Sequence, residues 1–171
     1  PLQAAEYRLQ EEGDDSQVTT VQFYDRTSFV NPCLPSTLRF TDKVMSEIVG
    51  MHQEAGQPLT RWHFGGDEAK NIYLGAGYTD TAHPEAGKGQ RDLSRQDKPW
   101  AKSARCASLL KSGKVASLNA LPGWFALQVS DIAKKQGMEG IQAWQDGLKE
   151  NRDNRQFATA NNVLNFWDTL Y

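Results

Sequence analysis

The strongest constraint on the fold lies at residues 59–69, which read LTRWHFGGDEA. Leu59, Trp62 and Phe64 supply the bulky side chains that are typical of a short β-strand. Gly65 and Gly66 carry no side chain, so another backbone or a ligand can approach them closely. The stretch therefore predicts a strand at 59–64 that ends in two glycines and delivers two carboxylates.

Asp67 and Glu68 are these two carboxylates, and they are adjacent in the chain. Neighbouring negative charges repel each other, which raises the pKa of at least one of the two groups. A carboxyl group with a raised pKa, beside one that stays ionised, is what general acid catalysis at neutral pH requires. From these residues alone a solvated turn is an equal alternative, because Gly-Gly-Asp-Glu is also good loop chemistry.

Helices and strands alternate along the rest of the chain, which argues for an α/β protein with a parallel sheet. Each helix is predicted from apolar residues at helical spacing, and each strand from a short apolar run. The predicted elements are a helix capped by Ser36 or Thr37 that runs to about Ala55, helices at 100–112 and from Pro122 to Gly137, strands near 139–144 and 163–167, a loop at 145–147 and a weak helix at 149–157.

Composition excludes several classes of protein. A chain of 171 residues with 39% hydrophobic and 23% charged residues is globular rather than disordered. A net charge of −2 gives no electrostatic reason to expect nucleic acid as a partner. No apolar run approaches the roughly 20 residues of a membrane span.

No metal or cofactor is expected from the motifs in the chain. A metal hydrolase using His63, Asp67 and His83 is a weak alternative, because their spacing matches no zinc motif. Cys33 and Cys106 also lack the Cys-x-x-Cys spacing of a metal or redox site, and two buried free thiols are one reading of them.

Several motifs together resemble one enzyme family. Residues 63–68 read HFGGDE, residues 31–34 read NPCL, residues 143–147 read AWQDG and residues 165–171 read NFWDTLY. The first of these resembles the His-x-Gly-Gly-Asp-Glu signature of glycoside hydrolase family 20, the β-N-acetylhexosaminidases. The others are similar to further motifs of that family in the same order, and the bacterial chitobiases within the family are the most similar.

The resemblance implies a fold. Family 20 enzymes have a (β/α)8 barrel, a fold that takes about 250 residues. Residues 1–171 are then expected to be a fragment of a single catalytic domain that holds roughly the middle strands and helices. Residues 70–99, too long for an ordinary connection, are expected to be a long loop on the active-site face. The chain also ends directly after an apolar strand, where domain boundaries seldom fall.

The resemblance also implies chemistry. Glu68 would be the general acid, and the nucleophile would be the acetamido oxygen of the substrate itself. Asp67 would orient that acetamido group and offset its developing positive charge. Trp144 and Trp167 would wall the acetamido pocket, although without the resemblance both would be read as core residues. His63 would point into the barrel and support Asp67.

The expected partner is an oligosaccharide with terminal N-acetylglucosamine, derived from chitin. The resemblance implies a periplasmic, outer-membrane-associated or secreted enzyme, where a Cys33–Cys106 disulfide would persist. Family sites also use an arginine, a tyrosine and a tryptophan from strands that this chain does not contain. We therefore expect the fragment alone to be inactive, and the alternative is a non-catalytic sugar-binding or structural fragment.

A partial barrel would also leave two open sheet edges and an apolar inner face in water. The fragment is therefore expected to self-associate or to keep disordered segments.

Overall fold

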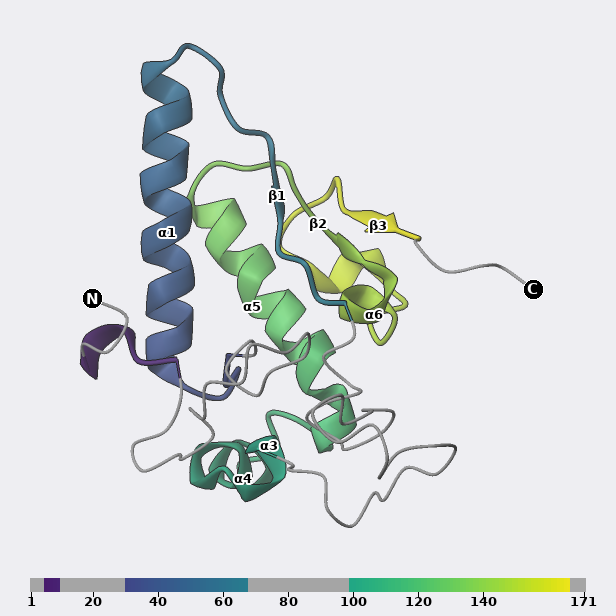
Figure 1. The fold of residues 1–171 in the computed structure, drawn as a ribbon. Coiled ribbons are helices and arrows are strands. Elements are labelled where there is room, and N and C mark those ends of the chain that lie inside the picture. Colours follow the sequence, from purple (N-terminus) through teal and green to yellow (C-terminus); the bar gives the residue numbers. More distant parts are fainter. Residues whose placement is uncertain (1–4, 10–29, 68–98, 167–171) are drawn as a thin grey trace, which may run out of the picture.

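Three parallel strands with helices packed behind them form the frame of the molecule (Figure 1). A computed structural model describes residues 5–9, 30–67 and 99–166. The elements in chain order are η1 (Ala5–Tyr7), α1 (Pro35–Glu54), β1 (Arg61–His63), α3 (Pro99–Lys102), α4 (Ala104–Lys111), η4 (Leu118–Ala120), α5 (Leu121–Lys135), β2 (Gly140–Trp144), α6 (Gln145–Leu148), η5 (Asn154–Gln156) and β3 (Val163–Asn165).

The sheet has the order β1-β2-β3, and both strand pairs are parallel. Arg61 lies opposite Gly140, and Trp144 lies opposite Asn165. The α/β class and the parallel sheet are therefore confirmed, while the described residues do not close into a barrel. All three strands run in the same direction, so their carboxyl ends share one edge of the sheet.

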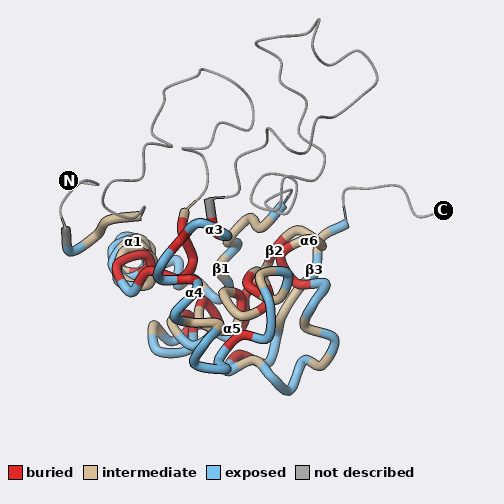
Figure 2. The backbone as a smooth tube through the Cα atoms, turned by 90° about the horizontal axis from the view of Figure 1, so that it is seen from below, coloured by how far each residue is buried: buried red, intermediate tan, exposed pale blue. Residues whose placement is uncertain are grey.

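One face of the sheet is buried against α1 and α5. Ile141 and Ala143 of β2 are fully buried, and Trp62 and Phe64 from the β1 segment pack into the same cluster. The helices contribute buried apolar residues to this core, namely Met45, Val49, Ala126, Val129 and Ala133. Figure 2 colours the buried residues of α1, α5 and β2 red.

The opposite face of the sheet is mainly polar. Side chains alternate between faces along a strand, so Arg61, His63, Gln142 and Asn165 share this face with Trp144 and Val163. Arg61 and His63 are exposed, and Gln142 donates a hydrogen bond of 2.9 Å from Nε2 to Asn165 Oδ1. The face expected to be apolar is therefore mixed in the described strands, where Trp144 and Val163 lie among hydrogen-bonding residues.

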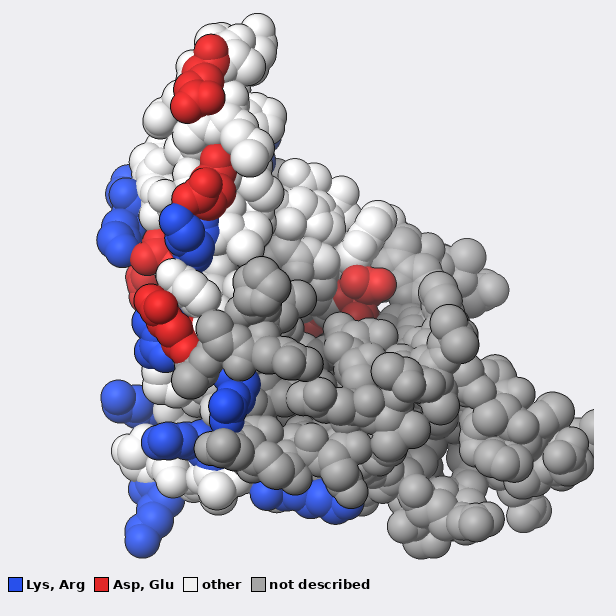
Figure 3. Space-filling view, turned by 60° about the vertical axis from the view of Figure 1, so that its left-hand side comes forward, with Lys and Arg blue, Asp and Glu red and all other residues white. Residues whose placement is uncertain are grey.

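Helix α1 begins at Pro35, so its N-cap lies two or three residues earlier than predicted. Leu34 is its N-cap residue and forms no side-chain cap, and Thr37 Oγ1 instead donates to the carbonyl of Asn31 at 2.7 Å. Proline suits the first helical position because its missing N–H has no partner there in any case. The helix ends as predicted before Gly56, which has a φ of +68°. In Figure 3, charged side chains line the exposed side of α1.

Other boundaries also differ from the predictions. The helix expected at 100–112 is two helices, because Ser103 leaves helical geometry and its side chain accepts the Cys106 N–H of α4. The loop expected at 145–147 is the short helix α6, and the weak helix expected at 149–157 is only the 3-10 turn η5. Strand β3 ends at Asn165, so Phe166 lies just beyond it, and Trp167, the last residue of the predicted strand, lies outside the described residues.

Helix α5 carries the predicted apolar stripe. Val129 and Ala133 are fully buried, and Phe125 and Ile132 are partly buried beside them. At its carboxyl end, Lys135 donates a hydrogen bond to Asp42 of α1, and this bond lowers the pKa of the Asp42 carboxyl. The two helices are therefore joined by both apolar packing and an ion pair.

A buried polar network holds β3 in place. Ser130 of α5 and Thr159 are hydrogen-bonded through their hydroxyls at 2.9 Å, and the Thr159 N–H donates to Ser130 Oγ at 3.0 Å. Asn162 Oδ1 accepts from Thr159 Oγ1 and from the backbone N–H of Ile141 in β2. Because buried polar groups need partners, this network favours one position of β3 beside β2.

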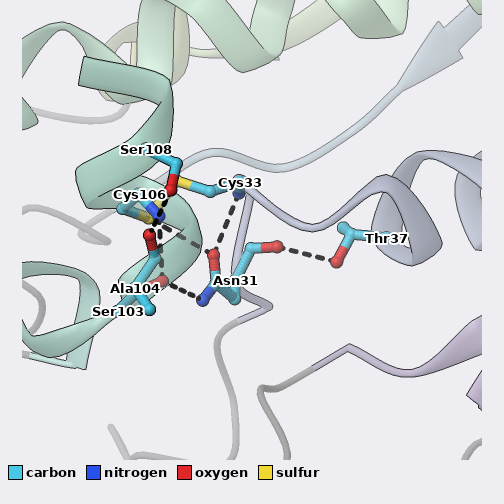
Figure 4. Close-up of a disulfide and its surroundings, with 7 residues drawn as sticks. All are labelled: Asn31, Cys33, Thr37, Ser103, Ala104, Cys106 and Ser108. Carbon is cyan, nitrogen blue, oxygen red and sulfur yellow. Dashed lines mark hydrogen bonds between the residues drawn. A yellow bond between two sulfur atoms is a disulfide. The ribbon is translucent and has the colours of Figure 1, made fainter. Parts of the chain in front are cut away.

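A disulfide joins Cys33 to Cys106, which confirms the expected bond (Figure 4). It links the segment before α1 to α4, 73 residues later. Asn31 lies beside it, accepting the Cys33 N–H at Oδ1 and donating from Nδ2 to Ser103 Oγ at 3.1 Å. The covalent bond and the asparagine therefore hold the same two segments together.

No helix within 5–9, 30–67 and 99–166 combines the length and the apolarity needed to cross a membrane.

Replacing both Cys33 and Cys106 by alanine should lower the free energy of unfolding by about 2–4 kcal/mol, because the bond closes a long loop in the unfolded chain. Urea unfolding of the oxidised protein and of the double variant would measure this difference. Reduced wild-type protein is the control, and it should unfold at the urea concentration of the variant. Equal midpoints for the oxidised protein and the variant would contradict the expectation.

Candidate functional site

The ladder between β1 and β2 continues past the formal end of β1. The Phe64 N–H donates to the Gln142 carbonyl at 3.0 Å, and the Trp144 N–H donates to the Gly65 carbonyl at 2.9 Å. These bonds extend the parallel pairing of β1 as far as Gly65, beside Trp144, the last residue of β2. The segment that precedes Asp67 is thus fixed to the backbone of Trp144.

The two glycines then turn the chain sharply. Gly65 has a φ of +76° and Gly66 a φ of +87°, a region that side chains strongly disfavour. A Cβ atom on Gly66 would lie 2.8 Å from the Cα atom of Gly147 in α6, closer than real carbon atoms approach. Both backbone conformation and space therefore require glycine at position 66.

Asp67 follows this turn with an exposed side chain. Its Oδ1 atom is 3.7 Å from the position that a Cβ atom on Gly65 would take. The carboxylate therefore turns back over the first glycine, at the carboxyl edge of the sheet. In a parallel α/β protein this is the edge where ligands bind.

His63 contacts both the backbone of Gly65 and the ring of Trp144. Its Nδ1 atom accepts the Gly65 N–H at 3.1 Å, so a neutral ring carries its proton on Nε2. Its ring meets the Trp144 ring edge-on, with centroids 5.5 Å apart and planes at 72°. Within the described residues no hydrogen bond joins His63 to Asp67, and the expected support of Asp67 by His63 stays a prediction.

Trp144 ends β2 on the same face as His63 and is partly buried. Its place beside the Gly65 backbone brings its indole to the strand edge that carries Asp67. The structure thus brings Asp67, His63 and Trp144 together. Glu68 and Trp167, the other predicted site residues, lie outside the described residues, as does the 70–98 part of the predicted active-site loop.

Two residues near this edge were not singled out from the sequence. Gln142 and Asn165 are hydrogen-bonded across β2 and β3 on the face that carries His63. The period of two along each strand, the reasoning applied to His63, would have placed them there. Asp146, which follows Trp144 in α6, pairs with Lys149 at 2.5 Å between Oδ1 and Nζ.

A metal site has no support in the part of the chain that the structure describes, where no three His, Cys, Asp or Glu residues gather in a position to hold an ion. His83, one member of the weak metal alternative, lies outside it.

The sequence matches glycosyl hydrolase family 20, catalytic domain, over residues 2–171. It is 54% identical to the N,N'-diacetylchitobiase of Vibrio harveyi, over 99% of this chain and 19% of that protein. It is 30% identical to the β-hexosaminidase of Vibrio vulnificus, over 86% of this chain and 14% of that protein. The β-hexosaminidase B of Pseudoalteromonas piscicida is 28% identical over 89% of this chain and 16% of its own length. The chain thus spans less than a fifth of each of these relatives.

Alanine substitutions at the two glycines should separate conformational strain from steric conflict. Gly65→Ala should cost about 1–2 kcal/mol, since only the left-handed backbone opposes it. Gly66→Ala should cost more, because its Cβ also meets the Gly147 backbone at 2.8 Å. Thermal unfolding of the two variants would measure the difference. Equal losses, or a greater loss at Gly65, would contradict the steric argument.

Proposed function

This chain belongs to glycosyl hydrolase family 20, and we propose that it forms part of the (β/α)8 catalytic barrel of a longer β-N-acetylhexosaminidase. The enzyme removes terminal N-acetylglucosamine from chitin oligosaccharides. One observation carries the proposal: Asp67 and Trp144, from neighbouring parallel strands, are held at one edge of the sheet by the hydrogen bond between their segments. A carboxylate beside an indole suits an acetamido sugar, whose N–H needs an acceptor and whose methyl group needs an apolar surface.

The proposed reaction uses the acetamido group of the substrate as nucleophile. Its carbonyl oxygen attacks the anomeric carbon while the glycosidic bond breaks, and Glu68 gives its proton to the leaving oxygen. The product of this step is a cyclic oxazolinium ion. Water then attacks the same carbon from the opposite side, Glu68 takes the proton from the water, and the acetamido group forms again. Two displacements leave the configuration at the anomeric carbon unchanged.

Asp67 has a separate role in this scheme. As a carboxylate it accepts the acetamido N–H, which orients the carbonyl oxygen toward the anomeric carbon. It also offsets the positive charge that develops on the ring of the intermediate. The indole faces of Trp144 and Trp167 confine the acetamido methyl group, so that the reactive conformation is favoured before the step begins. His63 supports this arrangement through its contacts with Gly65 and Trp144.

The proposed location is the periplasm, the outer membrane or the surrounding medium. The Cys33–Cys106 disulfide supports it, because such bonds persist in oxidising compartments.

Glu68→Gln in the full-length protein should lower kcat for an aryl β-N-acetylglucosaminide by about 10²–10⁴-fold with substrate binding retained, because only the proton transfer is lost. Asp67→Asn should also lower kcat, by about 10²–10³-fold, through the loss of charge stabilisation. Asp153→Asn is a matched control, since that exposed acid pairs with Arg155 away from the site.

Full activity in both site variants, or no activity in the wild-type protein, would favour the alternative of a non-catalytic sugar-binding protein. The isolated 171-residue chain serves as a second comparison in the same assay. It should show no hydrolysis, because family sites take groups from strands outside this chain.

The isolated chain should also self-associate. Leu164 and Phe166 are 37% and 59% exposed at β3, which pairs only with β2 among the described strands. An open strand edge next to apolar side chains is a surface that pairs with another copy. Light scattering over a range of concentrations would measure the mass, and a constant monomer mass at high concentration would contradict the expectation.

A further inference from the structure

Two glycines from different elements face each other behind the proposed site. A Cβ atom on Gly147 would lie 3.1 Å from the Cα atom of Gly66, 3.2 Å from Cε2 of Phe64 and 3.3 Å from Cβ of Ala143. Seen from the other side, a Cβ atom on Gly66 would lie 2.8 Å from the Cα atom of Gly147 and 3.2 Å from Phe64 Cε2. The turn after β1 therefore rests directly on the backbone of α6, and the Phe64 ring closes one side.

The need for glycine differs at the two positions. Gly66 has a positive φ, so its conformation alone favours glycine. Gly147 lies inside the helix α6 and is not among the glycines with positive φ. Alanine is the better helix former, so local conformation favours alanine at position 147. What excludes a side chain there is the space occupied by the Gly66 turn.

This contact closes a small ring that contains Trp144 and ends at the residue before Asp67. At one end the Trp144 N–H is bonded to the Gly65 carbonyl at 2.9 Å. At the other end Gly147, three residues after Trp144, touches Gly66, the residue before Asp67. The separation of Asp67 from the Trp144 ring therefore depends on how closely the two glycine backbones approach.

We infer that Gly147 is a positioning residue for the reaction, because its missing side chain lets the β1 turn settle against α6 and so sets the distance of Asp67 from Trp144. The inference rests on the proposed function. A side chain at position 147 has contacts of 3.1–3.3 Å to relieve, so the Gly66 turn moves by a few tenths of an ångström. Catalytic groups need placement within about 0.5 Å, and an error of about 1 Å costs about 10²-fold in rate.

The first test compares Gly147→Ala with Gly50→Ala in the full-length protein. Gly50 is also a helical glycine, but no atom lies within 4 Å of the place where its Cβ would be. Gly147→Ala should lower kcat about tenfold while KM changes less than about threefold, because Asp67 acts in the transition state. Gly50→Ala should keep the wild-type kcat. A wild-type kcat in Gly147→Ala would overturn the inference and leave the proposed function standing.

The second test asks whether the effect passes through Asp67. In an Asp67→Asn background, Gly147→Ala should lower kcat by less than about twofold, since residues that act as a unit are not additive. The same tenfold loss in both backgrounds would indicate general damage to the fold and overturn the inference alone. If Asp67→Asn has the activity of the wild type, the proposed function fails, and the inference fails with it.

A second variant covers the case in which Gly147→Ala does not fold. Phe64→Leu removes the ring that confines both glycines and adds no atom between them. It should lower kcat several-fold in the wild-type background and leave kcat unchanged in the Asp67→Asn background. Equal losses in the two backgrounds would overturn the inference.

Discussion

The hydrogen bond from the Trp144 N–H to the Gly65 carbonyl extends the pairing of β1 and β2 beyond the last residue of β1. The rest of the site depends on it, because it sets the register in which the chain reaches the two glycines. A slip of one residue would turn the carboxylate and the indole to opposite faces of the sheet. The apolar side chains of the opposite face, buried against α1 and α5, make such a slip costly.

The remaining constraints act on the frame rather than on the site itself. The disulfide and Asn31 join the start of α1 to α4, and Figure 1 places these elements toward the end of the molecule to which β1 runs. The Ser130–Thr159 network fixes β3 from within. A disulfide and buried hydrogen bonds thus hold the elements around the strands that carry Asp67 and Trp144. A site built from side chains of two different segments requires such a rigid frame.

Much of this frame could be predicted from the sequence. Helical spacing of apolar residues located α1 and α5, and the bulk of Trp62 and Phe64 located β1, because burial imposes those periods directly. The split of the 100–112 helix was missed because Ser103 caps α4 in the structure, whereas a serine is tolerated inside a helix as well. The polar residues of the inner face were also missed, although the period of two along β2 and β3 would have placed Gln142 and Asn165 on that face.

The candidate site was predicted in a different way. Asp67 and Glu68 stood out as adjacent carboxylates after two glycines, whereas the roles of His63, Trp144 and Trp167 came from resemblance to a family. Gly147 was out of reach of either argument. Its backbone conformation is one that any residue can adopt, and its importance lies in a contact with Gly66, which is distant in the chain. Only coordinates bring those two backbones together.

In the proposed function, one acetamido group lies between Asp67 and Trp144. A crystal structure of the full-length protein with bound N-acetylglucosamine would test this arrangement. The acetamido methyl group should lie against the Trp144 ring, with its N–H within hydrogen-bonding distance of the Asp67 carboxylate. A sugar bound elsewhere, or an acetamido N–H that faces a group other than Asp67, would contradict it.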